Sequence, residues 1–201
     1  MTFPKILTAS ALALTLAMPM AGPGFASSHG AMIETSVNEA DLPKKKTNEP
    51  GHYITAAESM ALLKERDDVA LIDIRSPEET MFVGYATDTD ANIPFMNVDP
   101  AHAYNPKKSA YKMMPNKGFV DQIKAFVAAN DPAALLIICR SGGRSAKAVD
   151  VLAKAGVATP AYTVVDGFEG DKSDAGKRTV NGWKNEGGAW TYKITDDLLT
   201  K

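Results

Sequence analysis

The feature that most constrains the fold is a short apolar run that ends at the single cysteine of the chain. Residues 133–138 read Ala-Ala-Leu-Leu-Ile-Ile and are followed directly by Cys139. A continuous apolar run of this length is typical of a strand that is covered on both faces. Residues 69–74 and 161–165 have the same character, and residues 92–98 are a further strand candidate. The sequence therefore predicts several short, buried strands.

Helix signals alternate with these strands. Thr55 and Glu58 form a capping box at the start of one helix, and Ser76 with Pro77 has the N-cap and first-turn pattern of a second. The predicted helices cover residues 55–66, the segment that begins at 76, residues 117–130 and residues 145–155. Because strands that alternate with helices are joined by right-handed crossovers, we predict an α/β fold. It would have a parallel sheet of about five strands with helices on both faces.

The first residues have the three-part layout of a secretory signal peptide. One positive charge, Lys5, precedes an apolar stretch over residues 6–18, and small residues lead up to a cleavage position after Ala26. The apolar stretch is shorter than the roughly 20 residues that span a bilayer. We therefore predict that residues 1–26 are removed and that the mature protein is periplasmic or secreted, with no membrane contact. An uncleaved membrane anchor is the alternative.

The rest of the chain divides into an arm and one domain. Residues 27–50 lack apolar periodicity and carry a run of lysines at 44–46, so we interpret them as a flexible arm with a solvated lysine run. Residues 51–195 would form a single domain. Within it, residues 99–116 are predicted to be a long surface excursion, and residues 168–195 an irregular tail anchored by aromatic side chains.

Composition and charge narrow the functional classes. The 201 residues, 45% of them hydrophobic, can bury a core that needs neither a structural metal nor a disulfide. The net charge is −2, from 22 basic and 24 acidic residues, which does not favour nucleic acid as a partner. The three histidines, His29, His52 and His102, lie far apart in the sequence, so we predict no metal site and no cofactor.

The candidate reactive residues follow the apolar run. They are Cys139, Arg140, Ser141, Gly142, Gly143, Arg144 and Ser145. The strand would deliver the cysteine to the carboxyl edge of the sheet, where α/β folds bind ligands. The two glycines let the backbone curl, so that its N–H groups form an anion-binding nest at a helix N-terminus.

These surroundings favour an anion on or beside the sulfur. A free thiol has a pKa of ~8.5, and a helix N-terminus next to arginine can lower it to ~6.5, at which most of the thiol is ionised at pH 7. We therefore expect Cys139 to be a nucleophile. The alternative is that Cys139 is a small buried hydrophobic residue without chemistry.

The loop over residues 139–145 is similar to the active loop of rhodanese-family sulfurtransferases. Asp73-Ile74-Arg75, at the end of a predicted strand, resembles the Asp-x-Arg pattern of that family. Residues 165–168 resemble the strand and glycine turn before the family's terminal segment, and Trp183 stands where a tryptophan is often found. The resemblance covers roughly residues 52–190.

The resemblance implies a rhodanese-like domain that transfers sulfane sulfur. Cys139 would attack a donor such as thiosulfate and hold the sulfur as a persulfide, bound by the amides of residues 140–145, including those of Ser141, Gly142, Gly143 and Ser145. Arg140 and Arg144 would attract the anionic donor and stabilise the departing sulfite. Asp73 and Arg75 would form a structural ion pair or loop brace. Cyanide, a thiol or a periplasmic protein would accept the sulfur.

The sequence departs from the family pattern in two places. Gly84-Tyr85-Ala86 stands where many members have Gly-His-Ile, and a polar stretch follows it at residues 87–91. The excursion at 99–116 and the tail at 168–195 enlarge the domain. We expect these segments to shape a lid or a partner surface.

Two other functions remain open. Cysteine phosphatases and arsenate reductases also cradle an oxyanion in such a nest, but their loops have five residues between cysteine and arginine, whereas this loop has four. The second alternative is a non-enzymatic persulfide carrier or interaction module, because a fold does not establish turnover.

Overall fold

The computed structural model describes residues 32–198. The predicted signal peptide at residues 1–26 and the start of the predicted arm lie outside this range. Of the helices between residues 32 and 198, none has both the length and the apolar character that crossing a membrane requires.

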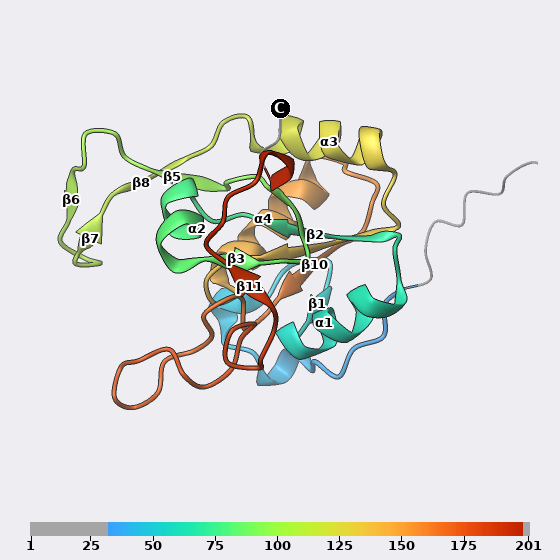
Figure 1. The fold of residues 1–201 in the computed structure, drawn as a ribbon, viewed down its shortest axis with the longest axis horizontal. Helices are drawn as coiled ribbons and strands as arrows, with labels where there is room; N and C mark the ends of the chain where they lie inside the picture. Colours follow the sequence, from blue (N-terminus) through green and yellow to red (C-terminus); the bar gives the residue numbers. More distant parts are fainter. Residues whose placement is uncertain (1–31, 199–201) are drawn as a thin grey trace, which may run out of the picture.

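A parallel sheet of five strands forms the centre of the molecule (Figure 1). Its strand order is β1-β10-β9-β2-β4, and every neighbouring pair is parallel. The strands are β1 (Tyr53–Ile54), β10 (Ala161–Val164), β9 (Ala134–Ile138), β2 (Val69–Asp73) and β4 (Thr89–Asn92). All residues of β2 and β9 are buried, because helices and loops cover both faces of these central strands.

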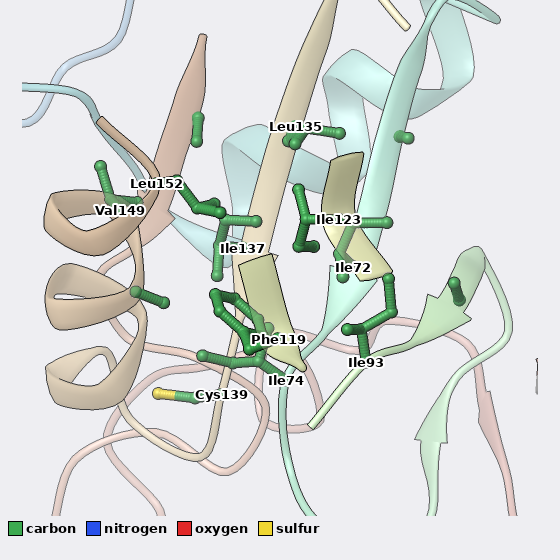
Figure 2. Packing of buried hydrophobic residues seen from close by; sticks show 14 residues of the cluster. Ile72, Ile74, Ile93, Phe119, Ile123, Leu135, Ile137, Cys139, Val149 and Leu152 are labelled. Carbon is green, nitrogen blue, oxygen red and sulfur yellow. The ribbon is translucent and has the colours of Figure 1, made fainter. Parts of the chain in front are cut away.

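Four α-helices flank this sheet within the described residues. They are α1 (Ala56–Glu65), α2 (Pro77–Val83), α3 (Phe119–Asn130) and α4 (Gly143–Lys154). Phe119 and Ile123 of α3, with Val149 of α4, pack on one face of β2 and β9 (Figure 2). Ala56 of α1 belongs to the cluster on the opposite face. The predicted α/β fold, with a sheet of about five strands and helices on both faces, is confirmed.

Local sequence signals set the starts of α1 and α2. The Thr55 hydroxyl accepts from the N–H of Glu58, whose side chain accepts from the N–H of Thr55 in return. Ser76 and Glu79 form the same reciprocal pair at α2, with Pro77 at the first helical position. Each pair satisfies N–H groups that a helix N-terminus otherwise leaves without partners.

The structure differs from the prediction of one strand over residues 92–98. Strand β4 ends at Asn92, and the next strand, β5 (Met96–Val98), belongs to a separate two-stranded sheet. Pro94 lies between them and has no N–H to donate, and the N–H groups of Ile93 and Phe95 on either side still donate to the carbonyl oxygens of Asp73 and Ile74 before the chain turns to β5. Helix α4 also begins earlier than predicted, at Gly143 instead of Ser145.

The predicted excursion over residues 99–116 is a long hairpin. Strand β5 pairs antiparallel with β8 (Met113–Pro115), and β6 (Tyr104–Asn105) pairs with β7 (Ala110–Tyr111) further out. Figure 1 shows β6 and β7 extending away from the body of the molecule. We call residues 99–116 the hairpin arm.

The described part of the N-terminal segment lies against the domain. It contains two short 3-10 helices, η1 (Glu39–Asp41) and η2 (Lys44–Lys46). The prediction of a solvated lysine run is wrong for Lys46, which is 4% exposed and forms a 2.6 Å ion pair with Asp171. A buried ammonium group needs such a partner, and the partner comes from a segment that is distant in sequence.

The C-terminal tail crosses the same face as α1. Trp183 is fully buried, and β11 (Trp190–Thr191) pairs antiparallel with β3 (Tyr85–Ala86). A last 3-10 helix, η3 (Asp196–Leu198), follows. The aromatic anchoring predicted for the tail is confirmed for Trp183.

Candidate active site around Cys139

Cys139 follows the last residue of β9 and lies at the carboxyl edge of the sheet. Its sulfur is directed toward the first turn of α4 (Figure 2). The residue is only 1% exposed and contacts the apolar cluster beneath it, yet it also lines a large cleft. The thiol therefore has an apolar side and an open side, so that a reactant can reach it only through the cleft.

The loop after Cys139 presents a set of backbone donors without protein acceptors. Among residues 32–198, no acceptor is recorded for the backbone N–H groups of residues 140–145. Helix α4 has Gly142 as its N-cap and no side-chain cap, so its first N–H groups are also free. An anion is the usual partner of such N–H groups at a helix N-terminus.

Two glycines fix this loop against the segment that follows β10. Gly142 has a φ of 88°, and a Cβ at this position would lie 2.1 Å from the carbonyl oxygen of Val165. Gly167 has a φ of 66°, and its Cβ would lie 2.6 Å from the Cys139 carbonyl oxygen. The N–H of Phe168 donates to the same carbonyl at 2.8 Å. This close approach is possible only without side chains at both positions.

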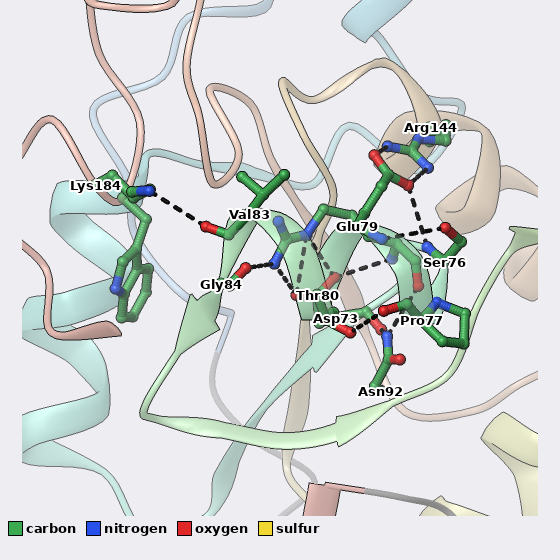
Figure 3. Close-up of polar contacts among 12 residues, drawn as sticks. Asp73, Ser76, Pro77, Glu79, Thr80, Val83, Gly84, Asn92, Arg144 and Lys184 are labelled. Atoms are coloured by element: carbon green, nitrogen blue, oxygen red, sulfur yellow. Dashed lines mark hydrogen bonds and ion pairs between the residues drawn. The ribbon is translucent and has the colours of Figure 1, made fainter. Parts of the chain in front are cut away.

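Arg144 does not face the loop as a free cation. Its guanidinium donates two hydrogen bonds of 2.6 Å to the carboxylate of Glu79 (Figure 3). Burial lowers the pKa of Arg144, but the hydrogen bonds and charge of Glu79 outweigh it, so the pKa lies above its ordinary value. Burial likewise raises the pKa of Glu79, and Arg144 reverses this effect to a net decrease. Arg144, which the resemblance assigns to attraction of the donor and stabilisation of sulfite, is instead paired with Glu79 in the structure.

Two further guanidinium groups lie at the cleft, Arg140 and Arg178, and only the first is in the contiguous loop. Arg140 is exposed, and Arg178 of the tail lines the same cleft. Burial lowers the pKa of Arg178, and the nearby charge of Arg140 lowers it further. Neither guanidinium forms an ion pair with another residue in the range 32–198. Nothing in the sequence marks Arg178, because its role depends on how the tail folds back.

Asp73 and Arg75 form a fully buried ion pair beneath the loop. Their side chains are 1% and 0% exposed, and the guanidinium also donates to the carbonyl oxygen of Gly84 at 2.9 Å (Figure 3). The ring of Phe168 lies 4.1 Å from the Arg75 guanidinium carbon. Asn92 donates to the carbonyl oxygens of both residues of the pair. The pair therefore braces β2, β4 and the start of the tail, and it does not line the cleft.

Ser141, Gly143 and Ser145 complete the loop. Ser141 and Gly143 line the cleft. Ser145 is fully buried in the first turn of α4, and its hydroxyl has no hydrogen-bond partner among the described residues. A buried hydroxyl without a partner is costly, and a partner bound in the loop would remove this cost.

The cleft above Cys139 has a volume of about 1000 Å³. Its apolar lining comes from α2, from residues 95–98 at β5 and from the hairpin arm, and its cationic lining comes from several elements. The apolar residues are Val83, Phe95, Met96, Val98, Tyr111 and Met113, and the lysines are Lys45, Lys108, Lys147 and Lys172. Glu78 and Glu79 are its two acidic residues, so the lining is predominantly basic although the whole chain is acidic.

A metal site needs several His, Cys, Asp or Glu side chains close together. Within the range 32–198, no group of three or more His, Cys, Asp or Glu side chains could hold a metal ion.

Comparison with known proteins agrees with this geometry. Residues 55–174 match the family model of the rhodanese-like domain. An uncharacterized protein of Rickettsia prowazekii, RP600, is 30% identical over 139 residues, which cover 69% of this chain and 94% of that protein. An uncharacterized protein of Rickettsia conorii, RC0915, is 29% identical over 140 residues, with 69% and 96% coverage.

A solved structure has a similar fold. The crystal structure of Rv0390 from M. tuberculosis superposes with a TM-score of 0.53 and 27% sequence identity, covering 70% of this chain and 96% of that chain. The matched family model includes β2, β9, the loop of residues 139–145 and α4. This chain belongs to the family of rhodanese-like domains.

Proposed function

We propose that this protein is a sulfurtransferase that carries sulfane sulfur on Cys139 as a persulfide. The observation that carries the proposal is the set of backbone N–H groups at residues 140–145, which directly follow Cys139 and have no recorded acceptor among residues 32–198. These donors lie at the N-terminus of α4, where negative charge is stabilised. A terminal persulfide sulfur is an anion of suitable size for such a set of donors.

In the first half-reaction, the Cys139 thiolate attacks the outer sulfur of an anionic donor such as thiosulfate. A bond forms between Sγ and that sulfur, and the sulfur–sulfur bond of the donor breaks. The electron pair of the broken bond leaves with sulfite. Arg140 and Arg178, both without ion-pair partners among residues 32–198, support attraction of the donor and stabilisation of the departing sulfite.

In the second half-reaction, a nucleophilic acceptor attacks the outer sulfur of the persulfide. Cyanide or a thiolate can serve, and Cys139 leaves as a thiolate with the electron pair of the broken bond. Ser145 contributes its backbone N–H to this set of donors, since its side chain does not line the cleft. We assign Arg144 a positioning role, because Glu79 occupies its guanidinium.

The ion pair between Glu79 and Arg144 argues against a phosphatase or an arsenate reductase. Those reactions need a guanidinium at the loop that is free to bind a tetrahedral oxyanion with two donors. Glu79 already accepts from both terminal nitrogens of Arg144. The short loop, with four residues between Cys139 and Arg144, adds to this argument.

We further propose that the protein works in the periplasm or as a secreted protein, without a cofactor. The support is the signal-peptide pattern of residues 1–26. Its substrate would be a small sulfur-containing anion, and a periplasmic protein would be a natural acceptor.

Steady-state turnover distinguishes an enzyme from a non-enzymatic carrier. The purified protein is mixed with thiosulfate and cyanide, and thiocyanate and sulfite are measured. We expect many molecules of thiocyanate per protein, and none with Cys139→Ser. A single stoichiometric release of thiocyanate would identify a carrier, and no release at all would overturn the proposed function.

A further inference from the structure

The hairpin arm is a concentrated positive charge on an acidic protein. Residues 99–116 contain Lys107, Lys108 and Lys112 against a single acidic residue, Asp99, whereas the whole chain has a net charge of −2. None of these lysines forms an ion pair within the described range of the chain. The arm therefore keeps a net charge of +2, from three lysines and one aspartate, and this charge is available to an acidic partner.

The same arm exposes large apolar side chains. Tyr104, Tyr111 and Met114 are 63%, 61% and 49% exposed. Aromatic residues and methionine are enriched at protein–protein interfaces. Within the described residues, β6 and β7 form a two-stranded sheet of their own that extends away from the core in Figure 1, and Tyr111 stays 61% exposed although its ring contacts His102.

The hairpin arm borders the cleft that contains Cys139. Lys108, Tyr111 and Met113 line the cleft that has Cys139 in its wall. Cys139 is 1% exposed, so an acceptor must bring its own sulfur into the cleft, which a flat surface cannot do. The cleft volume of about 1000 Å³ is at the upper end of the range for pockets that hold organic ligands, and a small inorganic anion would leave most of it unfilled.

We propose that the hairpin arm is the docking surface for an acidic protein that presents a cysteine on a protruding segment and receives the sulfur from Cys139. This inference rests on the proposed function. The partner's thiolate attacks the outer persulfide sulfur, the bond from that sulfur to Sγ breaks, and Cys139 leaves as a thiolate. The partner gains a persulfide, and no external oxidant or reductant is consumed.

Synthetic peptides with one cysteine test this proposal. Three peptides have the cysteine flanked by glutamates, glutamines or lysines, and cyanide and mercaptosuccinate serve as small acceptors. Transfer from the persulfide form of the full chain is followed by mass spectrometry. We expect the glutamate peptide to react at least about tenfold faster than the glutamine peptide at low ionic strength, with the advantage shrinking as salt is added.

Charge reversal on the arm provides the matched comparison. Lys107→Glu/Lys112→Glu changes exposed residues that lie outside the cleft lining, and Lys64→Glu/Lys124→Glu makes the same charge change on α1 and α3. We expect the first variant to lose the preference for the glutamate peptide. The preference is measured as the rate of sulfur transfer to this peptide divided by the rate of transfer to cyanide. The second variant should keep the preference. Thermal melting checks that both variants are folded.

The other outcomes are decisive. The docking proposal would be overturned by equal rates for the three peptides. It would also be overturned if Lys107→Glu/Lys112→Glu kept the preference for the glutamate peptide. In both cases, transfer to cyanide would still support the sulfurtransferase function. Mercaptosuccinate reacting as fast as the glutamate peptide would replace the protein partner by a small acidic thiol. Failure of the protein to form a persulfide, or to pass it to cyanide, would overturn the proposed function itself, and the docking proposal with it.

Discussion

Single residues decide whether the loop after β9 can form. Gly142 and Gly167 adopt positive φ values, and each lies where a Cβ would overlap backbone atoms of the facing segment. The sequence indicates a tight turn at Gly142-Gly143, but it does not indicate that Gly167 is the surface against which this turn packs. That contact joins segments separated by the whole of α4 and β10.

The first prediction concerns Gly142→Ala, with Gly176→Ala as its control. Both positions have positive φ, but a Cβ at 142 would lie 2.1 Å from the Val165 oxygen, whereas one at 176 meets nothing within 4 Å. We expect Gly176→Ala to lower the free energy of unfolding by about 1 kcal/mol. Gly142→Ala should lower it by more than about 3 kcal/mol because backbone must also move. Urea titration measures both, and equal losses would show that the loop is not held by this contact.

At the scale of elements, α2 and α4 are joined by Glu79 and Arg144. The two residues are 65 positions apart, and their side chains are about one-fifth exposed. The folded-state pKa of Glu79 lies below its ordinary value of 4.5, so its ionised form stabilises the fold above that pH. This contribution is lost as the pH falls below about 4.5 through the folded-state pKa.

The second prediction concerns the pH dependence of the stability that Glu79 contributes. Urea midpoints of the wild-type protein and Glu79→Gln are measured between neutral and acidic pH. The stability difference should be about 1–3 kcal/mol at neutral pH and should shrink as the pH falls below about 4.5. Other acidic groups titrate in both proteins, so the difference isolates Glu79. A difference that stays constant with pH would show that the ion pair adds no stability.

The N-terminal segment and the tail are joined by Lys46 and Asp171. The Lys46 side chain is 5% exposed and that of Asp171 is 39% exposed. The loss of stability therefore depends on which of the two charges is left without its partner. Asp171→Asn leaves a buried ammonium without its counter-charge and should cost about 2–4 kcal/mol. Lys46→Met leaves a carboxylate that water can reach and should cost about 1 kcal/mol or less. Chemical unfolding of both variants tests this order, and the reverse order would contradict the burial of Lys46.

Elements could be predicted where their sequence signals are local, and not where contacts between distant segments define them. The capping boxes at Thr55 and Ser76 and the apolar runs of β2 and β9 are local, and they locate these elements correctly. Strand β4 is missed because its sequence, Thr-Asp-Ala-Asn, is polar and only pairing with β2 makes it a strand. The burial of Lys46 and the pairing of Arg144 with Glu79 are contacts between distant segments, for which the sequence has no local signal.

Across the whole molecule, basic groups from three separate parts of the chain converge on one cleft. Lys45, Arg140, Lys147 and Arg178 line it, although the protein is acidic overall. The sequence analysis identified Cys139 and its loop because they are contiguous. It did not identify Arg178, because only the return of the tail brings this residue to the loop.

This field has a kinetic consequence. We expect the rate of sulfur loading from thiosulfate to fall as ionic strength rises, because a distributed positive potential attracts the anion. Arg178→Ala should slow loading by about threefold to tenfold and make it less sensitive to salt. Lys64→Ala, on α1, is the matched control and should change neither quantity. Stopped-flow measurements at several salt concentrations would contradict the account if the Arg178→Ala rates equalled those of the control.

The central claim is that Cys139 takes up one sulfur atom, and intact-mass spectrometry after exposure to thiosulfate tests it most directly. Cys139 is the only cysteine of the chain, so Cys139→Ser removes every thiol. We predict a gain of about 32 Da, one sulfur on the nucleophile, for the wild-type protein, and its loss on addition of cyanide. Cys139→Ser should show no gain. A wild-type mass that does not change, or a gain that persists in Cys139→Ser, would contradict the account.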